Sequence, residues 1–420
     1  MSTGTRGRQE AVAVLRVPVV LRFLMGKVMV GVGSWLLQIA IIDALYEASG
    51  SVLAIGVWFA VRMLPMILLA PIGGLLVDRW PKRVTLACST LLMGLVMLLY
   101  LGSLNAYLIL VVTLLLGTLQ VLYQPAEYSI IPCLVKPENL LGLNALMSGL
   151  NSALLVFGPA AGAVILSRLG LRWTVALDAC AFLAGTALFA TLSVKEPPRL
   201  AEKPRRRSLV ANLRFIPQAL KDAPTVVPVI ATCLLLILGA GMLQVSLYPY
   251  AVSVLGQSPG GYGLLLSAVG VGGLVGAAVA ASLRRRKGLT PVLFAAGALI
   301  SGIAITCTFG ALALPVGLVL MAVHGAGGAV YEASRDTLVQ TRSPVSGRGR
   351  VYSVMAALLT TANLCGTLVW GVVAEKAGVL STFLYGGIIV IAAGGYGMWT
   401  LARPSLRGRA LPDGPGLPPE

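Results

Sequence analysis

Twelve long apolar segments follow one another along this 420-residue chain. Each is long enough to cross the roughly 30 Å hydrocarbon core of a bilayer as a helix that rises about 1.5 Å per residue. With 57% hydrophobic and only 11% charged residues, the chain lacks the polar surface of a soluble protein. We therefore predict an all-α membrane protein with twelve transmembrane helices. The segments are 23–45, 52–77, 84–104, 106–133, 140–167, 173–193, 225–253, 260–283, 290–311, 314–340, 350–374 and 379–402.

The positions of Lys and Arg predict the orientation of these helices. With a cytoplasmic N-terminus, and with Arg335 and Arg350 at inner span ends counted with the inner segments, these segments hold 27 of the 32 Lys and Arg residues, the outer loops hold 3 and the spans hold 2. Cytoplasmic loops of membrane proteins carry such an excess of positive charge. We expect a multi-pass protein of the cell membrane with both termini in the cytoplasm. The net charge of +17 then indicates a basic inner face beside anionic lipid rather than a nucleic-acid site.

The longest polar stretch divides the chain into two similar halves. We predict a cytoplasmic N-terminus (1–22), a six-helix bundle (23–193), a basic cytoplasmic linker (194–224), a second six-helix bundle (225–402) and a disordered tail (403–420). An offset of 207 residues places Gly56 on Gly263, and one of 208 places Tyr123 on Tyr331. Two pseudo-symmetric halves with a substrate path between them are typical of secondary transporters.

Charged residues inside the spans are the candidates for proton coupling or substrate binding. A centred charge costs about 2.5–3.5 kcal/mol on insertion scales, so it usually has a function. A proton carrier needs a carboxyl group that desolvation makes hard to ionise. Glu127, in the inner part of the fourth span, is the first choice. The full set of candidates is Asp43, Arg62, Glu127, Asp178 and Glu332.

Structural alternatives accompany several of these candidates. Glu332 is three residues from Arg335, which can hold it in a local ion pair. Asp43 can be a solvated helix end, and Arg62 can form a structural ion pair with Glu127 or Asp178. Lys27, at an inner depth in the first span, is expected to snorkel to the interface.

The loop between the second and third spans resembles a signature of the major facilitator superfamily. Residues 74–83, GLLVDRWPKR, are similar to the family pattern G-x-x-x-D-R-x-G-R-[RK], and they depart from it at Pro81. The segments QPAEYSIIPCLV (124–135) and TLVQTRSPVSGRGRV (337–351) resemble the bacterial branch that contains macrolide and enterobactin exporters. The resemblance covers about residues 15–400, and it implies the major facilitator fold.

The resemblance also implies a gating role for this loop. In the family, the acid equivalent to Asp78 faces the N-terminus of the eleventh span when the cytoplasmic side is closed. Helix N-termini favour an anion, so Asp78 would latch one of two conformations. The alternative is that these charges only orient the helices. The predicted gating residues are Gly74, Asp78, Arg79, Lys82, Arg83, Arg348 and Arg350.

Gly158, Pro159 and Gly162 in the fifth span resemble the Gly-Pro signature of drug/proton antiporters. Proline removes a backbone donor and frees a carbonyl, so these residues predict a hinge. Glycine and proline are also common in membrane helices, and tolerated packing is the alternative. In the eighth span, Gly272 and Gly276 form a GxxxG pattern that favours close helix packing.

These features together predict a proton-coupled secondary transporter that exports lipophilic or amphipathic small molecules, such as drugs or antibiotics. An importer or a siderophore or metabolite exporter of the same fold is the first alternative, and a non-transporting scaffold or sensor is the second. We expect lipid, a small-molecule substrate and protons as partners, and a monomer. The single histidine, His324, and six scattered cysteines predict no metal site, and no enzyme or cofactor signature is visible.

Overall fold

The computed structural model describes residues 17–102, 105–136, 139–194, 224–283, 288–343 and 348–402. Within its helices, the side chains of residues 70–72, 74, 75, 78, 141, 145 and 348–350 are not described. Most of the predicted N-terminal segment, almost all of the predicted linker and the predicted tail therefore lie outside the described residues.

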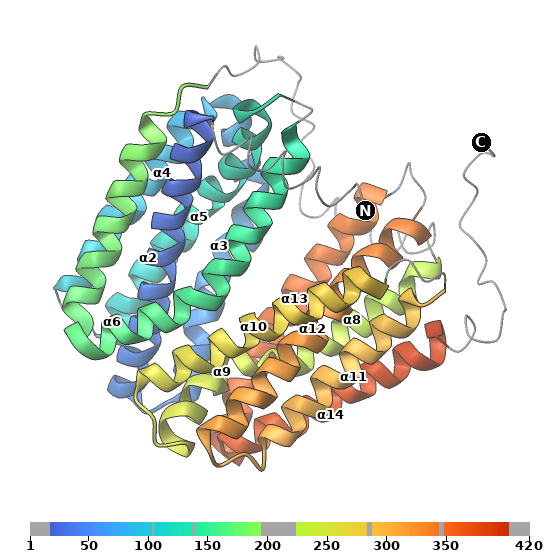
Figure 1. Ribbon diagram of the computed structural model, residues 1–420. Coiled ribbons are helices and arrows are strands. Elements are labelled where there is room, and N and C mark those ends of the chain that lie inside the picture. Colours follow the sequence, from blue (N-terminus) through green and yellow to red (C-terminus); the bar gives the residue numbers. More distant parts are fainter. Residues whose placement is uncertain are drawn as a thin grey trace, which may run out of the picture. The chain divides into compact units, whose positions relative to one another are not determined.

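The chain divides into two compact units, one of residues 1–50 and 61–206 and one of residues 51–60 and 207–420. The helices of the first unit run alongside one another and are drawn in blue to green in Figure 1. They are α2 (Pro18–Ser49), the larger part of α3 (Val52–Arg79), α4 (Lys82–Met97) with a 3-10 turn (Leu98–Leu101), α5 (Ala106–Leu134) and α6 (Leu140–Ala190).

Local sequence signals mark the ends of these helices. Pro18 stands in the first turn of α2, where its missing N–H is tolerated, and Gly50 ends α2 in the left-handed conformation with φ 63°. The side chain of Asn105 accepts a hydrogen bond from the backbone N–H of Leu108 and so caps α5. Helix α6 contains one non-helical residue, Gly170, with φ 76° and ψ 174°. This break divides α6 into the predicted fifth and sixth spans.

The second unit contains the remaining helices, in yellow-green to red in Figure 1. They are α8 (Val227–Ala240), α9 (Met242–Pro249) with a π-helical turn (Tyr250–Val254), α10 (Pro259–Leu283), α11 (Thr290–Thr308), α12 (Leu314–Arg342), α13 (Arg348–Ala377) and α14 (Val379–Gly397) with a final π-helical turn (Met398–Ala402). The predicted seventh span has a local irregularity at Gly241, between α8 and α9, where the backbone keeps right-handed helical dihedral angles.

The start of α3 belongs to the second unit and is attached to the end of α13. Glu375 accepts hydrogen bonds from the hydroxyl of Ser51, at 2.5 Å, and from the backbone N–H of Leu53, at 3.2 Å. A carboxylate at this position satisfies orphan donors of a helix N-terminus. The backbone of Leu53 also lies close against Gly371 of α13.

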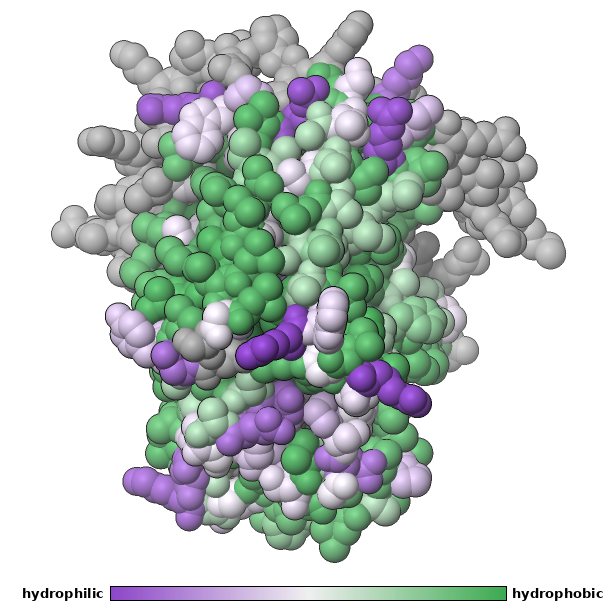
Figure 2. Space-filling view, turned by 90° about the vertical axis from the view of Figure 1, so that its left-hand side faces the viewer, coloured by the Kyte–Doolittle hydropathy of each residue, from purple (hydrophilic) through white to green (hydrophobic). Residues whose placement is uncertain are grey.

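The described residues contain eleven stretches that are long and apolar enough to cross a membrane. One of them, Gly142–Ala190, contains the break at Gly170 and holds two of the predicted spans. With this stretch counted as two, the described residues hold twelve helical stretches of a length and composition suited to crossing a membrane, the number predicted. Apolar side chains cover most of the face in Figure 2, and Leu92 and Leu95 of α4 are each 47% exposed. A surface of this kind suits contact with lipid tails rather than with water.

Candidate functional site

An ion pair inside the first unit joins α2 to α5. The ammonium group of Lys27 donates a hydrogen bond to the Glu127 carboxylate, and the two side chains are 13% and 7% exposed. Tyr123, one turn before Glu127 on α5, is buried and interacts electrostatically with the same carboxylate. A buried carboxylate is stable only when a partner compensates its charge. Lys27 supplies that compensation.

The expected snorkelling of Lys27 is therefore wrong. Its side chain turns toward α5 because a buried carboxylate lies within its reach, and the attraction between opposite charges grows as water is excluded. Glu127 is likewise committed to Lys27, so the ion pair between Arg62 and Glu127 that we considered is not formed.

Arg62 of α3 binds a side-chain amide of α2. Its guanidinium donates a 3.0 Å hydrogen bond to the side-chain oxygen of Gln38 on α2. It also interacts electrostatically with Tyr100, whose hydroxyl contacts Thr113 of α5 at 3.1 Å. These side chains form a polar layer that connects α2, α3, α5 and the turn after α4. Such a layer can orient a polar or anionic group of a ligand.

The other acids of the first unit differ in burial. Asp43 is 9% exposed, so it is not the solvated helix end that we considered, whereas Glu47 is exposed. Asp178 of α6 is 0% exposed, and neither of its carboxyl oxygens has a hydrogen-bond partner among the described residues. The ion pair between Arg62 and Asp178 is thus also absent.

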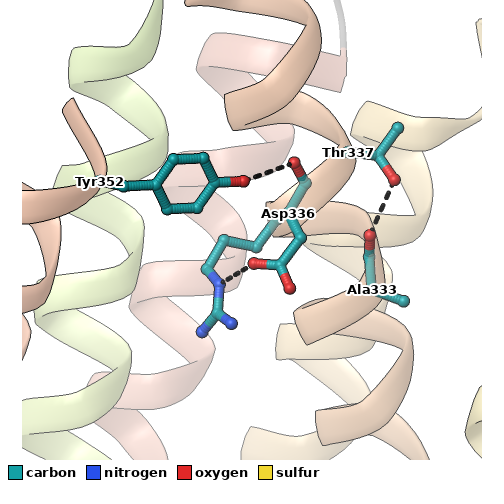
Figure 3. A network of polar contacts seen from close by, with 5 residues as sticks. Ala333, Asp336, Thr337 and Tyr352 are labelled. Carbon is teal, nitrogen blue, oxygen red and sulfur yellow. Dashed lines mark hydrogen bonds and ion pairs between the residues drawn. The ribbon is translucent and has the colours of Figure 1, made fainter. Parts of the chain in front are cut away.

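The corresponding acid of the second unit has a different setting. Glu332 of α12 is exposed, and Arg335 contacts Asp336, at 2.9 Å, in place of Glu332. Figure 3 shows this pair together with the hydroxyl of Tyr352 on α13, which donates a 3.3 Å hydrogen bond to the backbone carbonyl of Asp336. The guanidinium also lies 5.9 Å from the ring centre of Tyr331. Arg335 therefore forms its ion pair with Asp336, and the local ion pair considered between Arg335 and Glu332 is wrong.

An amide pair in the second unit was not predicted from the sequence. The side-chain amide of Gln244 on α9 donates a 2.9 Å hydrogen bond to the side-chain oxygen of Asn363 on α13. Near Gly241, the indole N–H of Trp370 donates to the carbonyl of Leu238, at 2.5 Å. One sequence signal could have found the pair, because an offset of 206 residues places Gln38 on Gln244. Each half thus carries a hydrogen-bonded glutamine on its first span.

The predicted gating loop is a tight connection between α3 and α4. Pro81 precedes α4 with φ −59°, a value that the proline ring favours, so the departure from the family's glycine suits this turn. Arg79 is exposed and Lys82 is half-buried. Arg83 donates to the carbonyl of Leu192 beyond the end of α6, at 3.1 Å. The structure does not describe the side chains or surroundings of the remaining predicted gating residues, which are Gly74, Asp78, Arg348 and Arg350.

The glycines of the predicted hinge pack against α2. A side chain at Gly158 would collide with the ring of Trp35, and Gly162 lies against the backbone of Trp35 and Leu36. Pro159 is inside a helical stretch, and Gly170 is the residue of α6 with non-helical dihedral angles. The contacts of Gly158 and Gly162 with α2 support the interpretation that these glycines serve helix packing. A hinge at Pro159 stays a prediction. Among the described residues, no group of three or more His, Cys, Asp or Glu side chains could hold a metal ion.

Many apolar helical stretches, with charges and hydrogen-bonded amides inside them, are typical of a class of protein, the multi-pass membrane transporters. The chain belongs to the transmembrane secretion effector family of the major facilitator superfamily, whose family model matches residues 9–407. The resemblance drawn from the loop at residues 74–83 is confirmed. Proteins of this kind are transporters and not enzymes.

Curated relatives of known and unknown activity align with most of the chain. It is 25% identical over 374 residues to the uncharacterized transporter YfiS of Bacillus subtilis, with 86% and 88% of the two chains covered. It is 24% identical over 355 residues to the multidrug resistance protein MdtG of Yersinia enterocolitica, with 84% of each covered. The enterobactin exporter EntS of Escherichia coli is 26% identical over 309 residues, with 71% and 72% covered.

A solved structure shows the same fold. A bacterial homolog of the human lysosomal transporter Spinster matches with a TM-score of 0.72 at 14% identity, over 94% of this chain and 98% of that one. The major facilitator fold predicted from the sequence is therefore confirmed.

Proposed function

We propose that the chain is a proton-coupled secondary active transporter that exports lipophilic or amphipathic small molecules by alternating access. The observation that carries this proposal is the buried pair of Lys27 and Glu127 inside the first half. Intramembrane ionisable groups in transporters mark ion and proton pathways. The relatives named for multidrug resistance and enterobactin export favour the export direction.

The pair couples protonation to structure in a simple way. An ionised Glu127 holds Lys27 and so joins α2 to α5. When Glu127 binds a proton, the attraction is lost and Lys27 is left with an uncompensated charge, which favours a conformation that exposes it to water. A proton thereby biases an equilibrium between two conformations. We place the termini in the cytoplasm and expect a monomer that uses lipid, a small molecule and protons as partners.

Flux measurements in proteoliposomes test this function. The full chain would be assayed against a panel of lipophilic dyes and antibiotics, with and without a pH gradient across the membrane. We expect export that requires the gradient. Transport of the panel that proceeds equally well without a gradient would contradict proton coupling, and transport that runs only inward would favour an importer of the same fold.

Substitution of the proposed coupling acid is the first prediction. Glu127→Gln removes the ionisable proton while keeping the side chain's shape, so gradient-driven export should fall by about 10- to 100-fold, an effect of the size seen for positioned acids and bases. Glu332→Gln is a matched control, because Glu332 is exposed. Full retention of gradient-driven export by folded Glu127→Gln would eliminate Glu127 from the coupling step.

The gating loop gives a second prediction. Asp78→Asn removes the charge that we propose to latch one conformation at the cytoplasmic side, and we expect transport to fall by about tenfold at normal expression. Arg172→Gln, which alters an exposed charge between the predicted fifth and sixth spans, serves as the control. Unchanged transport by Asp78→Asn would leave orientation as the only role of this loop.

A specific observation favours one alternative substrate. The relative EntS is named as an enterobactin exporter, so a siderophore is the second candidate, and the compound panel should include enterobactin. A scaffold or sensor without flux is disfavoured, because such a role does not need ion pairs inside the membrane.

A further inference from the structure

The carboxyl group of Asp178 is buried deep between two helices of the first half. Asp178 lies two turns beyond the break at Gly170, on the part of α6 that packs against α2. Its carboxyl group occupies the space in which a side chain at Gly33 of α2 would stand, and the ring of Phe182 lies against the same glycine. The site thus depends on a glycine opposite the acid, since any larger residue would displace the carboxyl group.

The elements around Asp178 offer it no counter-charge in contact. On α2, Lys27 and Asp43 are six and ten residues from Gly33, which is about 9 Å and 15 Å along the helix axis. Lys27 is moreover committed to Glu127 of α5. On α4, Thr85–Met97 contains no Asp, Glu, Lys or Arg. Arg62 of α3 and Tyr100 after α4 are the nearby polar groups, and Tyr100 interacts electrostatically with both Arg62 and Asp178.

This setting separates Asp178 from Glu127. Glu127 has an ammonium group as its partner, so its ionised form is compensated. Neither oxygen of Asp178 has a hydrogen-bond partner among the described residues, and the side chain is 0% exposed. An isolated carboxylate in an apolar interior is so costly that the group takes up a proton instead.

We infer that Asp178 binds a proton at neutral pH and is a second proton-binding acid of the first half. This inference rests on the proposed proton-coupled function, and it adds Asp178 to Glu127 as a group that takes part in coupling. When the half rearranges and water reaches the site, the O–H bond of Asp178 breaks and its proton passes to that water. Arg62, reached through the hydroxyl of Tyr100, is the cation that stabilises the carboxylate left behind. Glu127 then acts through its ion pair, by holding α2 to α5.

Infrared spectroscopy of the full chain in liposomes detects this proton directly. A protonated carboxyl group has a carbonyl stretching band that shifts to lower frequency in D2O, and a carboxylate lacks that band. At neutral pH, Asp178→Asn should remove one such band, and Glu127→Gln, the matched control in the same half, should leave it in place. Retention of every protonated-carboxyl band in Asp178→Asn would overturn the inference.

Two further measurements keep the test decisive. If Asp178→Asn does not fold, the wild-type chain is instead prepared with carbon-13-labelled aspartate. A protonated-carboxyl band that does not shift with this label would overturn the inference. The infrared band needs no transported substrate, so it can be measured even if the proposed transport function is wrong.

The second measurement is substrate flux in liposomes that show transport by the wild-type chain. There, Asp178→Asn should lower gradient-driven flux at least about tenfold and change substrate exchange without a gradient by less than about twofold. Equal loss of both would make Asp178 structural and overturn its part in coupling.

Discussion

The two halves place different chemistry at equivalent depths. An offset of 208 residues brings Glu127 onto Arg335 and Tyr123 onto Tyr331, and an offset of 206 brings Lys27 onto Cys233. In the first half these positions hold a buried ion pair between α2 and α5. In the second half the α8 position is an uncharged thiol, and the cation pairs with its own neighbour, Asp336, on α12. Among the described residues, the ion pair of the first half joins two helices, whereas the pair of Arg335 and Asp336 in the second half lies within one helix.

The halves also differ in how their glycines bring helices together. In the first half, side chains fill the space at the glycines of α2: an added methyl group at Gly26 or Gly31 would stand 2.5 Å from Phe189 or Leu154. In the second half, Gly272 and Gly276 of α10 lie against backbone atoms of Ala322 and Ala326 on α12, as the GxxxG pattern predicted. Side chains can rotate, whereas backbone carbonyls cannot, so we infer that the packing of α10 on α12 is more rigid than the packing at the glycines of α2.

Breaking the ion pair of the first half should have the largest effect on stability. Lys27→Met leaves the Glu127 carboxylate buried without a partner, which costs about 3–5 kcal/mol in the free energy of unfolding. Unfolding of the purified protein in mixed micelles, followed by circular dichroism, measures this loss.

The double variant of Lys27→Met with Glu127→Gln is the control for this experiment. It removes both charges, so most of the lost stability should return. A double variant that is no more stable than Lys27→Met would mean that packing of the lysine stem, and not charge, joins the two helices.

Glycine substitutions compare the packing of the halves directly. Gly276→Ala places a methyl group against the carbonyl of Ala326, so α12 must move, and we expect a loss of about 2–3 kcal/mol. Gly158→Ala meets the ring of Trp35, which can turn aside, and we expect about 1 kcal/mol. Thermal unfolding in detergent would rank the two. Gly328→Ala is the matched control in α12, since nothing lies within 4 Å of an added methyl group there. Equal losses for Gly276→Ala and Gly158→Ala would contradict the difference in rigidity.

Hydrophobic segments alone predicted the helices of this fold. Span length and hydropathy are local properties, and the break at Gly170 falls within the predicted connection between the fifth and sixth spans. The partners of the charged residues were not predictable in the same way. Lys27 and Glu127 are 100 residues apart in the chain, and nothing in the sequence around Lys27 distinguishes pairing from snorkelling. The isolation of Asp178 depends equally on which residues of α2 and α4 face it.

The smallest effect is expected for the ion pair of the second half. Asp336 is 48% exposed and its partner Arg335 is 19% exposed, and exposed pairs contribute only about 0–1 kcal/mol. Arg335→Gln should therefore lower the free energy of unfolding by less than about 1 kcal/mol, several-fold less than Lys27→Met. The same unfolding assay measures it, with Asp336→Asn as the partner variant. A loss from Arg335→Gln as large as that from Lys27→Met would mean that the guanidinium holds the second half together as the ammonium holds the first. The contrast between the halves would then lie in their packing alone.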